Sequence, residues 1–188
     1  LVKLVEMMDY GALRVEQAAL RTKNIHRGIG IASFIEVTNP SAAFYGVGGA
    51  KISSQDGVAV RLDAQGSVIC QTSITEQGQG SESLTAQIVG SVLGVSMDRV
   101  RVILGHTDNA PYGGGTWASR GAGIGGEAAL QATKVLRRSI LDVAAAILQS
   151  TAGELDIVNN CVVNIIDGAP RIELSELARI VYFRPDTL

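Results

Sequence analysis

The chain has 188 residues, and its 16 basic and 18 acidic side chains nearly cancel, to a formal net charge of −2 at pH 7. No block of like charge occurs, so nothing in this balance favours a nucleic-acid partner or an anionic membrane. Glycine is abundant, at 22 residues, whereas aromatic residues make up 4% of the chain. This composition is typical of tight loops that approach a ligand, and not of a binding surface built on aromatic anchors.

Two cysteines, Cys70 and Cys161, lie far apart in the sequence and neither belongs to a CxxC pair. This arrangement predicts no disulfide framework and favours a reducing compartment, so we expect a cytoplasmic protein. The longest uninterrupted apolar run, from Val143 to Leu148, is too short to cross a bilayer. Because the sequence opens at Leu1 without a methionine, we also expect it to be an internal segment of a longer protein.

The first forty residues show two different periodicities. Apolar residues within 4–8 share one helical face, and Asp9 is a plausible N-cap for a second helix that runs to Arg21. From residue 28 to residue 37 the period changes to two, which predicts a strand, with Glu36 on the same face as Phe34. We interpret the two helices as packing elements without chemistry. Glu36 is interpreted as an acid at an exposed edge or in an ion pair, with a buried functional carboxylate as the alternative.

The middle of the chain predicts a hairpin followed by a βαβ unit. Alternating apolar residues over 58–74 flank a turn at Asp63-Ala64-Gln65-Gly66, which is typical of a hairpin. A helix is predicted over 81–94 from apolar residues at every fourth position, and a further strand over 100–104. Another helix follows over 136–147. If the two strands around the first helix are parallel, their crossover should be right-handed.

The last forty residues predict short elements only. Apolar segments over 155–158 and 162–166 are separated by turns, and residues 174–182 read as a short helix. The expected fold class is therefore α/β (α+β), with a mixed sheet that contains βαβ units.

Two glycine-rich stretches each lie between an expected strand and an expected helix. We call Gln77-Gly78-Gln79-Gly80 the first glycine loop and Tyr112–Gly121 the second glycine loop. Each would present main-chain N–H groups at a helix start, where anions bind. Because parallel strands place such loops at the same edge of the sheet, we expect the two loops to face each other across one cleft and to bind one phosphate-bearing ligand.

The two loops offer hydrogen-bond donors and few nucleophiles. Besides N–H groups freed by glycine, they carry the Gln79 amide, the hydroxyls of Thr116 and Ser119, and the Arg120 guanidinium. This set suits a phosphate or pyrophosphate group, which an arginine can bind through two charge-assisted hydrogen bonds. The alternative is that the glycines only form turns and that Arg120 is a solvated surface charge.

Four familiar motifs are excluded by their context. Residues 121–126 match GxGxxG but no strand precedes them, so a nicotinamide dinucleotide site is not expected. Lys51 lacks the preceding glycine of a P-loop, and Ser119, with His106 and Asp108, lacks the GxSxG elbow of a hydrolase. The histidines and cysteines are not at ligand spacing, so any metal would have to arrive on a cofactor.

At these residues the sequence resembles a known family, the large, molybdenum-cofactor-binding subunit of the xanthine dehydrogenase and aldehyde oxidase family of molybdenum hydroxylases, nearest its carbon monoxide dehydrogenase-like branch. The matching motifs cover most of the chain in the family's order. They are Arg27-Gly28-Ile29-Gly30-Ile31-Ala32 leading to Glu36, Gly78-Gln79-Gly80-Ser81-Glu82-Ser83, Gly105-His106-Thr107-Asp108, Gly114-Gly115-Thr116-Trp117-Ala118-Ser119-Arg120, Gly125-Gly126-Glu127-Ala128 and Tyr182-Phe183-Arg184-Pro185.

The resemblance implies a molybdopterin that holds molybdenum, extended to a cytosine dinucleotide. By the family's pattern, Gly78, Gln79 and Gly80 would lie against the metal and pterin, with the Gln79 amide near a molybdenum oxygen. The cofactor phosphates and pterin would be bound by Thr116, Ala118, Ser119 and Arg120. The family hydroxylates aldehydes or N-heterocycles with oxygen from water, and passes electrons to iron–sulfur clusters and FAD on partner subunits or domains. The cofactor supplies the difficult chemistry in such enzymes.

Three departures from the family's pattern are visible. Ser83 replaces a common threonine, and His106 replaces a common aspartate. The family's general base is a glutamate in a Gly-x-Gly-Glu-type motif, and this chain contains none, since Glu127 belongs to a motif matched elsewhere in the family. We therefore assign no catalytic residue and no protein metal ligand, and expect no turnover from this chain alone.

The leading hypothesis is a segment of a molybdenum hydroxylase, with residues 1–40 ending a first molybdopterin-binding domain and residues 41–188 beginning a second. We expect a small-molecule substrate and no nucleic-acid or membrane partner. Two alternatives remain: a non-catalytic phosphate- or nucleotide-binding α/β module, and a degenerate family member without cofactor.

Overall fold

A computed structural model describes residues 1–184 and 186; Pro185, which closes the last matching motif, lies outside the described residues. The chain forms two compact units, Leu1–Glu36 and Val37–Leu188. Each is described by itself below. No helix in the described part of the chain is both long enough and apolar enough to cross a membrane.

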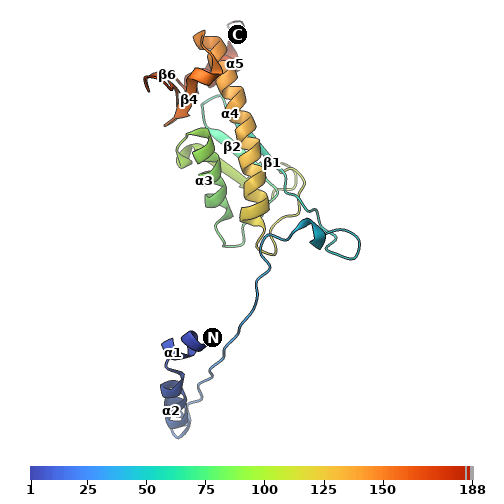
Figure 1. Cartoon of the computed structure of the whole chain (residues 1–188), viewed down its shortest axis with the longest axis vertical. Helices are drawn as coiled ribbons and strands as arrows, with labels where there is room; N and C mark the ends of the chain where they lie inside the picture. The colour runs from blue at the N-terminus through green and yellow to red at the C-terminus, as the bar shows by residue number, and fades with distance from the viewer. Residues whose placement is uncertain (185, 187–188) are drawn as a thin grey trace. The chain divides into compact units, whose positions relative to one another are not determined.

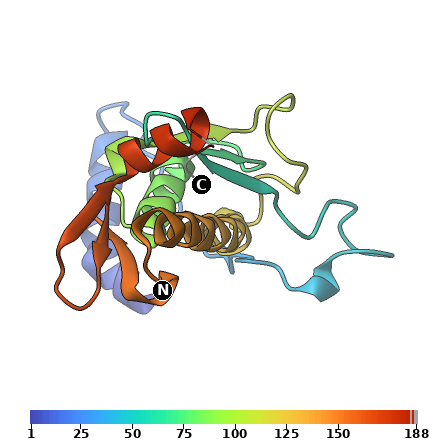
Figure 2. The same cartoon turned by 90° about the horizontal axis from the view of Figure 1, so that it is seen from above.

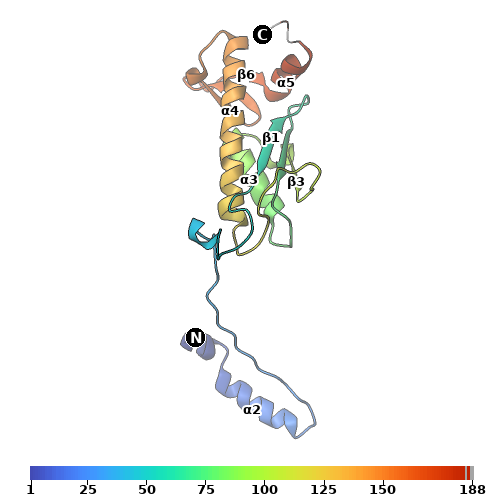
Figure 3. The same cartoon turned by 90° about the vertical axis from the view of Figure 1, so that its right-hand side faces the viewer.

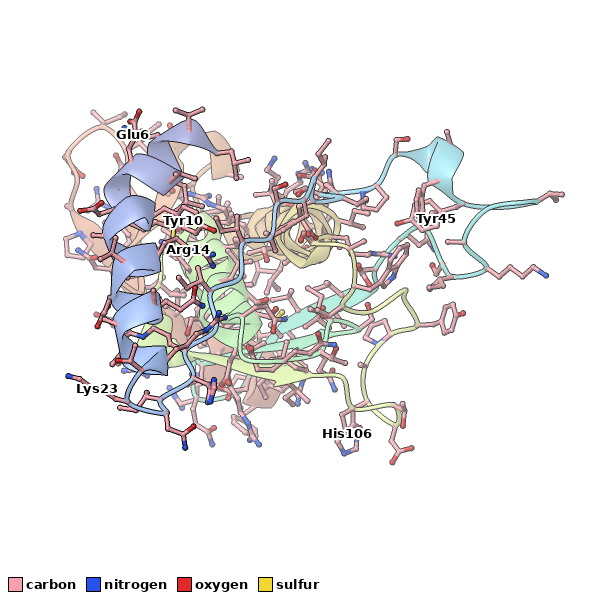
Figure 4. The ribbon with its side chains drawn as sticks, turned by 90° about the horizontal axis from the view of Figure 1, so that it is seen from below. Glu6, Tyr10, Arg14, Lys23, Tyr45 and His106 are labelled. Atoms are coloured by element: carbon pink, nitrogen blue, oxygen red, sulfur yellow. The ribbon has the colours of Figure 1, made fainter. Side chains whose placement is uncertain are left out.

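The first unit consists of two helices, α1 (Val2–Met7) and α2 (Tyr10–Arg21), as predicted. Asp9 sits between them in the left-handed backbone region, with φ 45°, and its carboxylate accepts a hydrogen bond of 3.3 Å from the main-chain N–H of Ala12. Asp9 therefore caps α2, as expected from its residue type. Figure 4 shows Tyr10 and Arg14 projecting from α2.

The strand predicted over residues 28–37 is wrong, because no strand forms there. A strand needs a hydrogen-bonded neighbour, and no described segment pairs with these residues. Phe34 and Ile35 are 81% and 99% exposed, so neither face of this segment is covered within the described chain. The alternation of apolar residues indicated an extended segment. It could not indicate whether a neighbouring strand would be present to pair with that segment.

The second unit is built on a three-stranded mixed sheet in the order β1-β2-β3. The antiparallel hairpin of β1 and β2 pairs Val60 with Cys70, and the parallel pairing of β2 and β3 places Cys70 opposite Val102. The predicted hairpin and βαβ unit are confirmed, although β2 ends two residues earlier than the alternation suggested. The strands are β1 (Val58–Leu62), β2 (Val68–Thr72) and β3 (Val100–Leu104).

Two helices, α3 (Ser81–Leu93) and α4 (Gly126–Leu148), lie side by side against one face of this sheet (Figure 1, Figure 3). Figure 2, a view nearly along α4, shows α3 beside it. Helix α3 ends at Gly94, whose φ of 70° is the left-handed stop expected from the sequence. The core between helices and sheet includes Val68, Cys70, Val89, Leu93, Ile140 and Ala144.

A second, antiparallel sheet and a helix complete this unit, in the order β4-β5-β6. The apolar segments noted over 155–158 and 162–166 overlap the first two strands, and the predicted last helix is confirmed, but β6 was missed because Ile172 is its one large apolar residue. The elements are β4 (Leu155–Val158), β5 (Cys161–Asn164), β6 (Pro170–Glu173) and α5 (Leu174–Phe183). Short helical turns are η1 (Ala42–Phe44), η2 (Met97–Arg99), the π-helical η3 (Gly121–Gly125) and η4 (Ala152–Glu154).

Candidate cofactor-binding site

The two glycine loops meet at the edge of the sheet where β2 and β3 end. The Thr116 hydroxyl donates to the carbonyl of Thr75 at 2.7 Å and accepts from the Thr75 N–H at 2.9 Å. Nearby, the Gln77 amide donates to the Thr116 carbonyl at 3.4 Å. The expectation that two loops about 40 residues apart converge on one rim is therefore confirmed, since these hydrogen bonds join residues 39 and 41 positions apart.

The first glycine loop is exposed and is organised by a residue just before it, Glu76. One oxygen of its carboxylate accepts from the N–H groups of Gly78 and Gly80, at 2.9 and 3.0 Å. The other oxygen accepts from the N–H of Glu82 in the first turn of α3, at 3.0 Å. Main-chain hydrogen bonds from Glu82 and Gly80 lower the pKa of Glu76.

This arrangement corrects one detail of the sequence interpretation. The N–H groups of Gly78 and Gly80 were expected to be free for a phosphate, but they are bound to the Glu76 carboxylate. The glycines are still required by the backbone, whose φ values there are 96° and 80°. A Cβ at either glycine would meet nothing within 4 Å, so the outer face of the loop is open.

The Gln79 side chain is folded back onto its own loop. Its amide nitrogen donates to the Thr75 carbonyl at 2.9 Å and to the Ser81 hydroxyl at 2.7 Å, while its oxygen accepts from the Gln77 N–H at 2.6 Å. Both amide hydrogens are thus in use. A ligand oxygen would have to displace one of these acceptors to be bound by Gln79.

The second glycine loop is packed tightly against its surroundings. A Cβ at Gly113 would lie 2.1 Å from the Ser73 hydroxyl, and one at Gly114 would lie 2.2 Å from Nη1 of Arg120. Ala118 and Ser119 both have left-handed backbones, with φ 47° and 50°. Such conformations cost free energy in residues other than glycine and persist only where the surrounding structure holds them.

The start of the helix after this loop is also packed closely. A Cβ at Gly125 would lie 2.1 Å from Cδ1 of Ile74, the second residue after β2. Gly125 therefore serves the close packing of a helix start that was interpreted from the sequence for 121–126, whereas a Cβ at Gly121 would meet atoms only at 3.8 Å. The π-helical turn η3 leads into α4 there.

Arg120 is completely buried, so its interpretation as a solvated surface charge is wrong. Its Nη2 donates to Asp56 at 2.8 Å and its Nη1 donates to the Ser53 carbonyl at 2.7 Å. The guanidinium also lies 5.8 Å from the ring centre of Tyr45 and 5.6 Å from that of Trp117, within the range of cation–π attraction. Its predicted contact with cofactor phosphates stays a prediction.

Asp56, like Glu76, is a residue at this site that sequence reasoning missed. Its side chain is fully buried, and besides Arg120 it accepts hydrogen bonds from Ser73 and Gly115. In sequence, Asp56-Gly57 reads as an ordinary turn, and no local pattern indicates a partner 64 residues away. Only the general rule that a buried arginine needs an acidic partner could have indicated Asp56.

A groove of about 330 Å³ lies beside the loops. It is lined by Ser73 and Thr75 after β2 and by residues within 105–113 after β3. His106, in the second of these segments, is exposed and has Nδ1 3.3 Å from the side-chain nitrogen of Asn109 (Figure 4). The groove occupies the sheet edge where the sequence predicted a ligand.

The residues present fit an oxygen-rich organic group better than a protein-bound metal ion. Three buried polar atoms of one cluster, Oη of Tyr45, Nε1 of Trp117 and Nε of Arg120, make no hydrogen bond within the described part of the chain. All three can donate. Across residues 1–184 and 186, no three histidine, cysteine, aspartate or glutamate side chains could together hold a metal ion.

Comparison with known proteins identifies the family. The model of the molybdopterin cofactor-binding domain matches residues 3–188. The nicotine 6-hydroxylase large subunit of Paenarthrobacter nicotinovorans is 30% identical over 96% of this chain and 22% of its own length. The carbon monoxide dehydrogenase large chain of Afipia carboxidovorans is 34% identical over 82% of this chain and 20% of its own length.

Solved structures agree with this match. Quinoline 2-oxidoreductase from Pseudomonas putida 86 superposes with a TM-score of 0.71 at 32% identity, over 98% of this chain and 23% of that one. A Cu,Mo-CO dehydrogenase superposes with a TM-score of 0.67 at 29% identity, over 99% of this chain and 24% of that one. The chain thus spans about a fifth of the length of these relatives. It belongs to the molybdopterin cofactor-binding domain family.

Proposed function

We propose that this chain is part of the large subunit of a molybdenum hydroxylase. It binds one side of the subunit's molybdenum cofactor, and that side lies between the two glycine loops. The observation that carries the proposal is the convergence of the two loops at one sheet edge, where Gln77 of the first glycine loop donates to the Thr116 carbonyl. Thr116 also exchanges two hydrogen bonds with Thr75, two residues before the first glycine loop. The matched family binds molybdopterin, which gives the chemical class of the ligand.

In this proposal each loop has a different task. The open face of Gly78, Gln79 and Gly80 lies against the pterin and metal, since no side chain covers it within 4 Å of the glycine positions. Thr116, Ala118, Ser119 and Arg120 shape the opposite wall, which holds the pterin and its phosphates. When bound, the cofactor would supply two-electron oxidation of a carbon centre with oxygen from water.

The finer features are also proposals. Polar donors along the second glycine loop suit the pyrophosphate of a cytosine dinucleotide form of the cofactor. The names of two relatives refer to nicotine and quinoline, which are N-heterocycles, so we propose an N-heterocycle or an aldehyde as substrate. Since several relatives are large subunits or large chains, we propose iron–sulfur and flavin partner subunits that receive the electrons.

The division of labour within the complete subunit follows from the sequence motifs. Residues 1–40 would end one molybdopterin-binding domain and residues 41–188 would begin the next. No general base was found in this chain, so the catalytic glutamate would come from elsewhere in the subunit. We therefore expect no turnover from residues 1–188 alone.

The test is the cofactor content of the complete subunit, expressed with its partner subunits. Gln79→Ala removes the side-chain amide that is folded onto the first glycine loop, and Thr116→Val removes the hydroxyl that binds Thr75 just before that loop. Both variants should lose molybdenum and pterin by about 10-fold, the range seen when supporting residues of a bound group are changed. Gln131→Ala, which removes an exposed amide on α4, is the matched control and should keep the wild-type content.

Wild-type molybdenum content in both loop variants would contradict the site. Absence of molybdenum and pterin from the wild-type complex would contradict the function itself. In that case the non-catalytic phosphate-binding module, or a family member that has lost its cofactor, becomes the better account.

A further inference from the structure

We propose that Asp56 is a positioning residue for the cofactor site, and that Arg120 acts through Asp56 and not through direct contact with the cofactor phosphates. The consequence for cofactor binding rests on the function proposed above. The structural part of the inference, that Asp56 holds the second glycine loop in its observed conformation, stands on the geometry of the chain alone.

Asp56 joins three segments that are distant in sequence. One carboxylate oxygen accepts from the Ser73 hydroxyl at 2.8 Å and from the Gly115 N–H at 3.0 Å. The other accepts from Nη2 of Arg120 at 2.8 Å. Asp56 therefore ties its own loop to the end of β2 and to two points on the second glycine loop.

The surrounding main chain reinforces the same junction. Ser73 also accepts from the Gly57 N–H at 3.0 Å and donates its own N–H to the Gly57 carbonyl at 3.0 Å. The Gly114 N–H donates to the Gln55 carbonyl at 2.9 Å. Since a Cβ at Gly114 would collide with both Arg120 and the Ser53 carbonyl, the junction leaves no room for a side chain at this point of the loop.

The charges explain why the pair occurs together. Both side chains of the Asp56–Arg120 ion pair are 0% exposed, so each ion would be costly to bury without the other. A buried ion pair often stabilises a protein no better than apolar side chains of the same volume. What apolar residues could not do is accept the Gly115 N–H.

Burial keeps Arg120 out of reach of a phosphate. Its Nη2 donates to Asp56 and its Nη1 to the Ser53 carbonyl, which uses two of the five N–H donors of the guanidinium. Its Nε makes no hydrogen bond within the described part of the chain, but the whole side chain is buried. Arg120 is thus a structural partner of Asp56 at this site.

The experiment uses the complete subunit with its partner subunits and separates stability from positioning. Asp56→Asn keeps the shape and removes the charge. The double variant Asp56→Leu/Arg120→Met replaces both ions by apolar groups of similar volume. Ser73→Ala deletes one hydrogen bond of Asp56 and keeps the ion pair. Asp156→Asn, which breaks the partly exposed pair with Arg137, is the matched control.

Three quantities are measured for each variant: molybdenum per subunit, the melting temperature, and amide hydrogen exchange of peptides that cover residues 113–121. Asp56→Asn should lose molybdenum and speed this exchange, each by about 10-fold, and Ser73→Ala should do so by less. The double variant should regain the wild-type melting temperature while molybdenum stays low. Asp156→Asn should keep the wild-type molybdenum content.

A double variant that regains both melting temperature and molybdenum would overturn the proposal, because the pair would then be structural only. Wild-type exchange over 113–121 in Asp56→Asn would overturn it as well, whatever the molybdenum content. If the double variant does not fold, Ser73→Ala decides by the same exchange measurement, and an unchanged rate contradicts the proposal. Absence of molybdenum from the wild-type complex would contradict the proposed function. Amide hydrogen exchange over residues 113–121 would then still test whether Asp56 positions the second glycine loop.

Discussion

The two glycine loops reach the same edge of the sheet but use glycine for different reasons. In the first, Gly78 and Gly80 have open space around them and are needed for their positive φ angles, while Glu76 binds their N–H groups. In the second, Gly113 and Gly114 are needed because side chains and main chain press against them.

This difference assigns different physical roles to two similar-looking motifs. The first glycine loop is exposed and shaped by main-chain hydrogen bonds to one carboxylate, so changes there should act locally. The second is fixed by the buried Asp56–Arg120 pair, so changes there should spread to the whole unit. The expected effects below run from the largest to the smallest.

The largest effect should come from Arg120→Met. This change leaves the Asp56 carboxylate buried without its cation, and breaking a buried pair in this way costs about 3–5 kcal/mol. Denaturant unfolding of the complete subunit measures the loss in free energy of unfolding. The double variant with Asp56→Leu should recover most of it, and a single variant as stable as the wild type would contradict the importance of the pair.

A matched pair of glycine substitutions compares the loops directly. Gly114→Ala forces a Cβ to within 2.4 Å of the Ser53 carbonyl, so we expect a loss at the upper end of the roughly 1–3 kcal/mol typical of overpacking. Gly78→Ala meets no atom and should cost only the left-handed strain of about 1–2 kcal/mol. Equal losses of stability would remove the distinction between the loops.

The contact that joins the loops is tested by Thr116→Val. This variant leaves the Thr75 N–H and carbonyl without their partner, which should cost about 1–3 kcal/mol. Thr116→Ser keeps the hydroxyl and is the control. If Thr116→Val unfolds at the same denaturant concentration as the serine variant, the two loops are not held together by this side chain.

The smallest effect concerns pH and Glu76. Because hydrogen bonds to Glu82 and Gly80 lower the pKa of Glu76 in the folded protein, its contribution to stability is present above the ordinary value of about 4.3. That contribution is lost as the pH falls through the lowered pKa. The protection of residues 78–82 against hydrogen exchange, measured relative to the intrinsic rate at each pH, should therefore fall in acid in the wild type.

The matched comparison uses Glu76 and Glu82, two carboxylates near the start of α3. Glu76→Gln should speed exchange of residues 78–82 at neutral pH and make it less dependent on acid, whereas Glu82→Gln leaves the three N–H bonds to Glu76 in place. Identical behaviour of the two variants would show that Glu76 does not organise the first glycine loop.

Local patterns predicted most of the fold. The hairpin of β1 and β2 and the βαβ unit were readable because each contains its own packing partner within a few tens of residues. Residues 28–37 failed for the opposite reason, since their alternation requires a neighbour that the described chain does not provide. The short strand β6 escaped notice because its pattern is mostly polar.

The site was predicted in its position but not in its internal contacts. Convergence of the loops followed from the parallel pairing of β2 and β3, which fixes the edge at which both strands end. That Asp56 pairs with Arg120, and that Glu76 occupies the N–H groups of the first glycine loop, depends on side-chain geometry that no spacing rule contains.

The most direct test of the account is an experimental structure of the complete subunit with its molybdenum cofactor bound. The account predicts that one cofactor contacts both glycine loops, with the pterin or metal beside Gln79 and the phosphates along residues 116–119, while Arg120 remains paired with Asp56. A cofactor that contacts neither loop, or only one of them, would contradict it.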